Sequence, residues 1–435
     1  MNLASWQRAA FLFLLASYGV LFYFILTFQQ GIDFASFYSA SQTLMLGNNP
    51  YQTLVATYLP VVKKLACNLN PPFVLMLFSP LAKLNYHAAL TTWWIISLIL
   101  SLVAARLVFK HVFSADFYQE NWPSLYLLYL AFFGILMDRA ITQLGALLLF
   151  GIILGYHFYS KKKDYWAGAL WGFVIALKFF PALLFFYVLL QKRYQVFVVM
   201  LGIALFLSLL PMIIYGTDIY TYYFAMMPKV QWYGDNWNAS VYGFLFRTLV
   251  DVHDKTQSRL YINILYGVLF IAFLLWYLKK ASTLLTASRD KQFFALTLSM
   301  MLLLSPFGWL YYFSLLIFPL ALTWEMFFLH GDSIKQKILW LLSLFLLNFP
   351  IDYLSSKKMT ELFNKFSIYS FYFYGLLLLI YLLSREHTPI TRFHRAPASA
   401  RHYPVIIIIF AFGFLIPVLS FLERLFDLPF IKISD

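Results

Sequence analysis

The sequence predicts an all-α polytopic membrane protein, and three features of the 435-residue chain support that prediction. Hydrophobic residues make up 62% of it and charged residues only 11%, whereas soluble domains carry about 25% charged residues. The apolar residues fall into long runs, and the many Phe and Tyr residues suit the aromatic belts of a bilayer protein. Basic residues gather in short loops between those runs. We therefore interpret the net charge of +14 as a topology signal and as contact with the lipid bilayer, and we expect no nucleic acid partner.

About 12–13 apolar segments are expected to form transmembrane helices, since a span needs roughly 17 to 25 apolar residues. The predicted segments are 9–28, 88–109, 123–138, 140–158, 165–177, 180–190, 194–215, 258–278, 292–304, 308–328, 336–350, 367–384 and 403–421. Two neighbours, 165–177 and 180–190, are too short to cross alone, and Pro181 near their junction should break the helix. We expect a broken helix there that lines a polar cavity.

The basic loops set the predicted orientation. With the N-terminus in the cytoplasm, 18 of the 32 basic residues fall in short inner loops, as the positive-inside rule expects. They are Arg8, Arg106, Lys110, 161–163, Lys192, Arg193, Lys279, Lys280, Arg289, Lys291, Lys335, Lys337, Arg385, Arg392, Arg395 and Arg401. The last of these fall largely in a basic cytoplasmic loop, 388–402. We therefore expect a multi-pass protein of the cell inner (plasma) membrane.

The apolar stretch 71–84 is too short to span and holds three prolines, so we expect an outer-face interfacial or re-entrant helix. The outer loops are then 29–87 and 216–257. Cys67 is the only cysteine, which excludes an intramolecular disulfide.

Five motifs follow one another along the chain. They are DFASFYSASQTLMLGNNPY (33–51), NPPFVLMLFSPLAKLNYHAALTTWW (70–94), YWAGALWGFVIALKFFPALLFFYVLLQKRY (165–194), NASVYGFLFR (238–247) and SPFGWLYYFSLLIFPL (305–320). In this order they resemble glycosyltransferase family 87, a group of GT-C membrane transferases that includes mannosyltransferases using polyprenyl-phosphate sugars.

The resemblance implies a GT-C fold, with a transmembrane catalytic module over residues 1–330 and additional C-terminal transmembrane helices over 331–435. It implies transfer of a mannose-like sugar from a polyprenyl-phosphate donor to a glycolipid or glycan acceptor, with inversion, on the periplasmic or extracellular side. Two motifs depart from the family pattern. The family's late box usually carries two adjacent histidines where this chain has Tyr311 and Tyr312, and its G-Q-x-N appears here as TQLG, which keeps only Gln143.

Asp33 is the expected catalytic residue. It follows the first apolar segment at the predicted outer boundary, carboxylates are suitable bases for sugar hydroxyls, and the resemblance implies the same role. The alternative is a helix N-cap, because Asp before FASFYSASQTL would satisfy free backbone N–H groups.

Donor-phosphate contacts are expected from Lys178, at the predicted helix break, and from Arg139. A lysine binds phosphate as a point charge, although Lys178 could instead extend to the interface. Arg139 could equally pair with Asp138 beside it. Tyr311 and Tyr312 could donate hydrogen bonds to the phosphate, or belong to an interfacial aromatic belt.

Sugar or acceptor contacts are expected from Tyr38, Gln143, Trp237, Asn238 and Trp309. Trp faces pack on sugar C–H surfaces and amides can bridge two hydroxyls, while an interfacial belt is the simpler role for a single Trp.

No metal site emerges from the sequence, and no cofactor is assigned; a divalent cation stays open because related enzymes of the GT-C class can use one. Two other functions also stay open. A membrane transporter or lipid flippase would suit broken helices, and a family member without activity would suit the missing histidine pair.

Overall fold

The computed structural model describes residues 3–29, 32–59, 62–230, 232–250, 259–329, 333–350, 370–385 and 403–426. Helices dominate these residues, which confirms the all-α prediction. The loop expected at 388–402, and residues 251–257 of the second predicted outer loop, lie outside the described part of the chain.

Four stretches are long and apolar enough to cross a bilayer among the described residues: Tyr86–Val112, Tyr194–Tyr215, Leu260–Thr283 and Leu310–Phe328. Shorter apolar helices cover Leu12–Thr27, Pro72–Ala82, Gly145–Ser160, Asp164–Leu177, Phe180–Leu190, Phe371–Leu383 and Ile406–Ser420. The protein is therefore a polytopic membrane protein, while the number of 12–13 spans stays a prediction.

The chain forms two compact units, each made of discontinuous segments. Unit 1 comprises Met1–Leu21, Val108–Met137 and Trp232–Asp435, and unit 2 comprises Phe22–Leu107 and Asp138–Gln231. Three of the four unit boundaries fall inside the helices α1 (Leu3–Phe24), α4 (Tyr86–Val112) and α6 (Phe133–Ala140). The functional division expected at residue 330 is a different one and stays a prediction.

Unit 2 contains a compact helical group and a short hairpin. Besides most of α4, its elements are η1 (Ile25–Gln29), α2 (Ile32–Met45), β1 (Val55–Ala56), β2 (Lys63–Lys64), α3 (Pro72–Ala82), α7 (Gly145–Ser160), α8 (Asp164–Leu177), η2 (Phe180–Leu183), α9 (Leu184–Leu190), α10 (Tyr194–Tyr215), α11 (Asp218–Met226) and η3 (Met227–Lys229). The strands pair antiparallel. Helix α3 matches the expected short helix at 71–84, and it packs against α2 through the rings of Phe34, Phe37 and Phe78.

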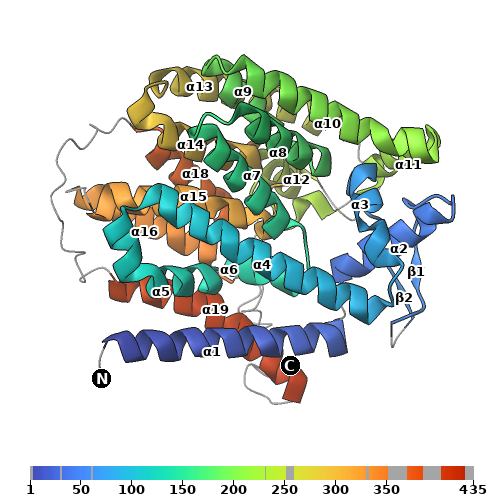
Figure 1. Ribbon diagram of the computed structural model, residues 1–435, viewed down its shortest axis with the longest axis horizontal. Helices are drawn as coiled ribbons and strands as arrows, with labels where there is room; N and C mark the ends of the chain where they lie inside the picture. The colour runs from blue at the N-terminus through green and yellow to red at the C-terminus, as the bar shows by residue number, and fades with distance from the viewer. Residues whose placement is uncertain are drawn as a thin grey trace. The chain divides into compact units, whose positions relative to one another are not determined.

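Helices α7, α8 and α10 lie side by side, with α8 in the middle (Figure 1). Glycines on α8 allow this close packing. A Cβ atom at Gly172 would lie 2.6 Å from the carbonyl oxygen of Met200 on α10, and one at Gly168 would lie 2.8 Å from that of Val196. The four-residue spacing of these glycines is the small-residue pattern by which membrane helices approach closely.

The break predicted near Pro181 is confirmed. Helix α8 ends at Leu177, Lys178 has extended backbone angles (φ −151°, ψ 133°), and the 3-10 turn η2 with Pro181 leads into α9. Proline at the start of a helical turn is favourable, whereas within a continuous helix it would remove a backbone hydrogen bond. Lys178 therefore lies between two short apolar helices.

Unit 1 contains the rest of the helices. They are α5 (Ala115–Ala131), η4 (Trp232–Gly234), α12 (Val241–Leu249), α13 (Leu260–Thr283), η5 (Ala287–Arg289), α14 (Asp290–Leu304), η6 (Leu310–Leu316), α15 (Ile317–Trp324), η7 (Glu325–Leu329), α16 (Ile334–Asn348), α18 (Phe371–Leu383) and α19 (Tyr403–Phe426), with the first part of α1 and of α6. Helices α16 and α18 pack together, and α19 packs on α16 and on α5.

The expected single segment 123–138 is two helices. Helix α5 ends at Ala131, Phe132 is extended, and α6 begins at Phe133. The buried side chain of Asn348 explains the break, because its Oδ1 accepts the N–H of Phe133 at 2.6 Å while its Nδ2 donates to the carbonyl of Ile409. A distant polar side chain thus replaces a bond that the continuous helix would have made.

The glycine contacts generate a stability prediction. Gly172→Ala places a methyl group against the backbone of α10, and overpacking of this kind costs about 1–3 kcal/mol. We expect a lower thermal unfolding midpoint in detergent. Gly202 on α10 has nothing within 4 Å of its Cβ position, so Gly202→Ala should leave the midpoint unchanged or raise it. Equal midpoints for the Gly172→Ala and wild-type proteins would contradict the packing.

Candidate functional site

Asp33 and Gln143 meet in unit 2 although 110 residues separate them. Asp33 lies in the first turn of α2, where the helix dipole favours a carboxylate. The carboxamide Nε2 of Gln143 donates to its Oδ2 at 2.5 Å. Gln143 is 6% exposed and Asp33 is partly exposed. A buried amide thus holds the carboxylate of Asp33 while part of that residue stays accessible.

Lys178 faces the same carboxylate from the break between α8 and η2. Its ammonium interacts with Asp33 by charge, and its side chain is partly exposed. An ammonium between apolar helices is costly unless an anion accompanies it. The break therefore places a cation and a carboxylate together in one unit.

The protein around Asp33 raises the pKa of its carboxyl group above the ordinary value. Burial is the largest cause, while the hydrogen bond from Gln143 and the ammonium of Lys178 act in the opposite direction. Asp33 lies outside the candidate membrane-spanning stretches. A raised pKa makes a carboxylate a stronger base, as long as it remains ionised at the working pH.

Arg139 is not directed at Asp33 but pairs with its neighbour. Its guanidinium forms an ion pair with Asp138, and both side chains are nearly fully buried, at 2% and 1% exposed. The other carboxylate oxygen of Asp138 accepts the N–H of Gly145 at 2.9 Å, where α7 begins. The structure thus shows the pair of Asp138 and Arg139, and the phosphate contact expected of Arg139 stays a prediction.

Tyr38 belongs to a cluster of tyrosines in unit 2. Its hydroxyl donates to the carbonyl of Leu84 at 2.7 Å, and its ring lies edge-on to those of Tyr58 and Tyr86, with centroids 5.2 and 5.3 Å away. Tyr38 is 5% exposed. Its hydroxyl thus ties α2 to the end of α3, and the sugar contact expected of it stays a prediction.

Asn238 in unit 1 joins two chain segments. Its Nδ2 donates to the carbonyls of Tyr233 and Pro306, and its Oδ1 accepts the N–H of Ser240. Backbone bonds from Ala239 to Gly308 and from Leu310 to Trp237 complete the join. Asn238 is fully buried, so both amide hydrogens serve the fold, and the sugar-bridging role predicted for it finds no spare donor.

The other predicted residues of unit 1 lie around the same join. The aromatic rings form a row with neighbouring centroids 4.7–5.4 Å apart: Tyr233, Phe307, Trp309, Tyr311 and Tyr312. Trp309, Tyr311 and Tyr312 are at most 6% exposed, and Trp237 is partly exposed. The phosphate and sugar roles predicted for these residues stay predictions.

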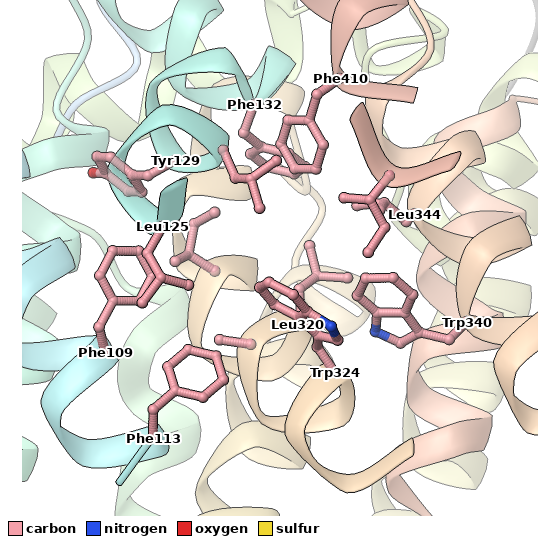
Figure 2. A pocket seen from close by; sticks show the side chains of 14 residues that line it. Phe109, Phe113, Leu125, Tyr129, Phe132, Leu320, Trp324, Trp340, Leu344 and Phe410 are labelled. Carbon is pink, nitrogen blue, oxygen red and sulfur yellow. The ribbon is translucent and has the colours of Figure 1, made fainter. Parts of the chain in front are cut away.

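A pocket in unit 1 is lined almost entirely by apolar atoms. About 50 Å³ in volume, it lies among apolar and aromatic side chains of five helices, including Phe109, Tyr129, Leu320 and Trp324 (Figure 2). Small-molecule sites usually measure about 300–1,000 Å³ and contain a few converging polar groups. We therefore place the candidate site at Asp33 and not here.

The sequence does not indicate the partner of Asp33 in unit 2 or, in unit 1, the partners of Arg247. Gln143 was expected to bind a sugar hydroxyl, whereas it donates to Asp33. Arg247 was not singled out, although its guanidinium donates to the carbonyls of Asp235 and Asn238. The sequence motifs that contain Gln143 and Arg247 can be recognised, but no neighbouring residue in the sequence indicates their hydrogen-bond partners.

Among the described residues, no three His, Cys, Asp or Glu side chains gather as metal ligands would.

Comparison with known proteins identifies the family. The model of glycosyltransferase family 87 matches residues 68–306, more than half of the chain. The match includes Arg139, Gln143 and Lys178, and Asp33 precedes it. No curated protein and no solved structure matches the chain. The protein, with its helical membrane architecture, therefore belongs to glycosyltransferase family 87, a GT-C type family of membrane glycosyltransferases.

Proposed function

We propose that this glycosyltransferase moves a mannose-like sugar from a polyprenyl-phosphate donor to a glycolipid or glycan acceptor, with Asp33 as the general base. The observation that carries the proposal is the carboxylate of Asp33, a partly exposed residue, which accepts a hydrogen bond from Gln143 and interacts by charge with Lys178. Family membership supports sugar transfer over the transporter alternative.

The proposed reaction is a single inverting displacement. The acceptor hydroxyl gives its proton to the carboxylate of Asp33 as its oxygen attacks the anomeric carbon of the sugar. The bond between that carbon and the phosphate oxygen breaks, and its electron pair leaves with the polyprenyl phosphate. A β-linked donor would then give an α-linked product.

Lys178 stabilises the departing phosphate in this proposal. Before the reaction its ammonium faces the carboxylate of Asp33. During the reaction Asp33 is neutralised by the incoming proton while negative charge grows on the leaving phosphate, and the nearby ammonium of Lys178 stabilises that charge. Burial lowers the pKa of Lys178 to about 7, and the charge of Asp33 acts in the opposite direction. One lysine can thus serve both charges in turn.

The proposed site lies on the extracytoplasmic side of the inner membrane. The distribution of basic residues along the sequence supports this orientation, because it leaves Asp33 at the start of an outer loop. A lipid-linked donor would be presented there with its phosphate at the boundary where α2 begins.

Replacing the proposed base tests the assignment directly. Asp33→Asn keeps the shape of the side chain and removes its basicity, so we expect transfer to fall by about 10²- to 10⁴-fold. The assay is transfer of radiolabel from polyprenyl-phosphate mannose to membrane lipid extract by the purified protein. Donor binding, measured as stabilisation against thermal unfolding, should persist.

Asp218→Asn is the matched control. Asp218 also lies in the first turn of a helix of unit 2, α11, but it is exposed. That variant should retain wild-type transfer. Full transfer activity in Asp33→Asn would refute the proposed base, and wild-type protein that transfers no sugar but moves the lipid across vesicles would favour a transporter.

Lys178→Met should weaken the donor complex and change the pH dependence. Loss of a charge-assisted contact to phosphate should raise KM for polyprenyl-phosphate mannose about 10- to 100-fold. The ammonium lowers the pKa of Asp33, so its removal raises that pKa, and the acid limb of the kcat/KM profile should move to higher pH. Lys83→Met, at an exposed lysine of unit 2, should change neither quantity. An unchanged acid limb and KM in Lys178→Met would exclude both roles.

A further inference from the structure

The turn between α6 and α7 is organised around one buried carboxylate. Asp138 accepts the N–H of Gly145 at its Oδ1, and its backbone carbonyl accepts the N–H of Gln143 at 3.1 Å. Its other carboxylate oxygen pairs with Arg139. Asp138 therefore binds Arg139 near the end of α6, Gly145 at the start of α7, and the backbone N–H of Gln143 between them.

Thr142, just before Gln143, has an unusual backbone conformation. Its φ of +55° lies in the left-handed region, which β-branched residues rarely adopt. The indole N–H of Trp93, on α4, donates to the carbonyl of Thr142 at 3.3 Å. Such conformations persist where surrounding contacts impose them, and they concentrate at functional sites. The turn is thus held from α4 as well as from within.

The orientation of the Gln143 carboxamide is fixed at both ends. Its Oε1 accepts the N–H of Leu144 at 3.3 Å, while its Nε2 donates to Asp33. The opposite orientation would bring the amide oxygen against the carboxylate of Asp33, where both atoms are acceptors. The turn therefore selects the orientation in which Gln143 is a donor.

We propose that Asp138 is a positioning residue of the transferase, which holds the turn so that Gln143 donates to the carboxylate of Asp33. This inference rests on the proposed function, since it matters for catalysis only if Asp33 is the base. In this arrangement Asp138 touches no substrate, and it acts through Gln143. Arg139 serves the same end, because it balances the buried charge of Asp138.

The consequence for Asp33 has a definite sign. Donation from Gln143 favours the ionised carboxylate and so lowers the pKa of Asp33. Lys178 is the charged group that faces Asp33 from the break after α8. Helix α3, which packs on α2, carries no charged side chain. Of the tyrosines in that region, Tyr38 and Tyr58 donate their hydroxyls to the carbonyls of Leu84 and Ala35, and the ring of Tyr86 contacts that of Phe34. A change in the turn should therefore appear in the titration of Asp33.

A double-mutant cycle tests this inference through the pH profile of kcat/KM for polyprenyl-phosphate mannose. In Gln143→Leu the acid limb should move upward by about 1 pH unit. Asp138→Asn should move it in the same direction. If Asp138 acts through Gln143, the double variant should show no larger shift than Gln143→Leu alone, since coupled residues are not additive.

Asp164→Asn is the matched control, because Asp164 also forms an ion pair, with Arg193, in the same unit. It should leave the acid limb unchanged. Trp93→Phe provides a second probe if Asp138→Asn does not fold, since it keeps an aromatic ring at this position and removes the indole N–H that donates to Thr142; its acid limb should also move upward.

Three outcomes separate the two proposals. An acid limb that stays at the wild-type pH in both Asp138→Asn and Trp93→Phe, while Asp33→Asn abolishes transfer, would overturn the positioning role alone. A shift in the double variant equal to the sum of the single shifts would overturn it as well. Full transfer by Asp33→Asn would overturn the proposed function and this inference with it.

Discussion

The hydrogen bond from Gln143 to Asp33 is the contact on which this account depends. It joins the first turn of α2 to the turn before α7 across 110 residues, at a carboxylate that also faces Lys178. A carboxylate among apolar helices is costly unless it is bound and balanced. Here the amide of Gln143 binds the carboxylate and the ammonium of Lys178 balances its charge, while part of Asp33 remains accessible. The arrangement suits a base, because burial raises the pKa of Asp33 while Gln143 and Lys178 favour its ionised form.

The rest of unit 2 provides the geometry for this contact. The glycines of α8 let it pack closely against α10, and the break at Pro181 then leaves Lys178 between two short helices. The turn centred on Asp138 fixes Gln143. Backbone irregularity within apolar surroundings is tolerated where it is buried in protein or lines a polar cavity. Both irregular segments, at Thr142 and at Lys178, lie in the unit that contains Asp33.

Hydrophobic pattern alone predicts most of the helices, because a run of apolar residues between basic loops has few alternatives in a membrane protein. Helix α10 has the expected bounds, and the broken helix at Pro181 follows from proline chemistry. The division of 123–138 at Phe132 could not be foreseen, since it depends on Asn348 more than 200 residues away. The same limit applies to the site. Asp33 and Lys178 stand out in the sequence as charges in apolar surroundings. In contrast, the hydrogen bond from Gln143 to Asp33 and the one from Asn238 to the carbonyl of Pro306 arise only from tertiary contacts.

A structure of the Asp33→Asn variant with bound polyprenyl-phosphate mannose would test the central claim most directly. The account predicts that the donor phosphate contacts the ammonium of Lys178, and that the anomeric carbon faces residue 33, with space between them for one acceptor oxygen. Gln143 should remain beside residue 33. A donor whose phosphate binds away from Lys178, with its sugar out of reach of residue 33, would contradict the account.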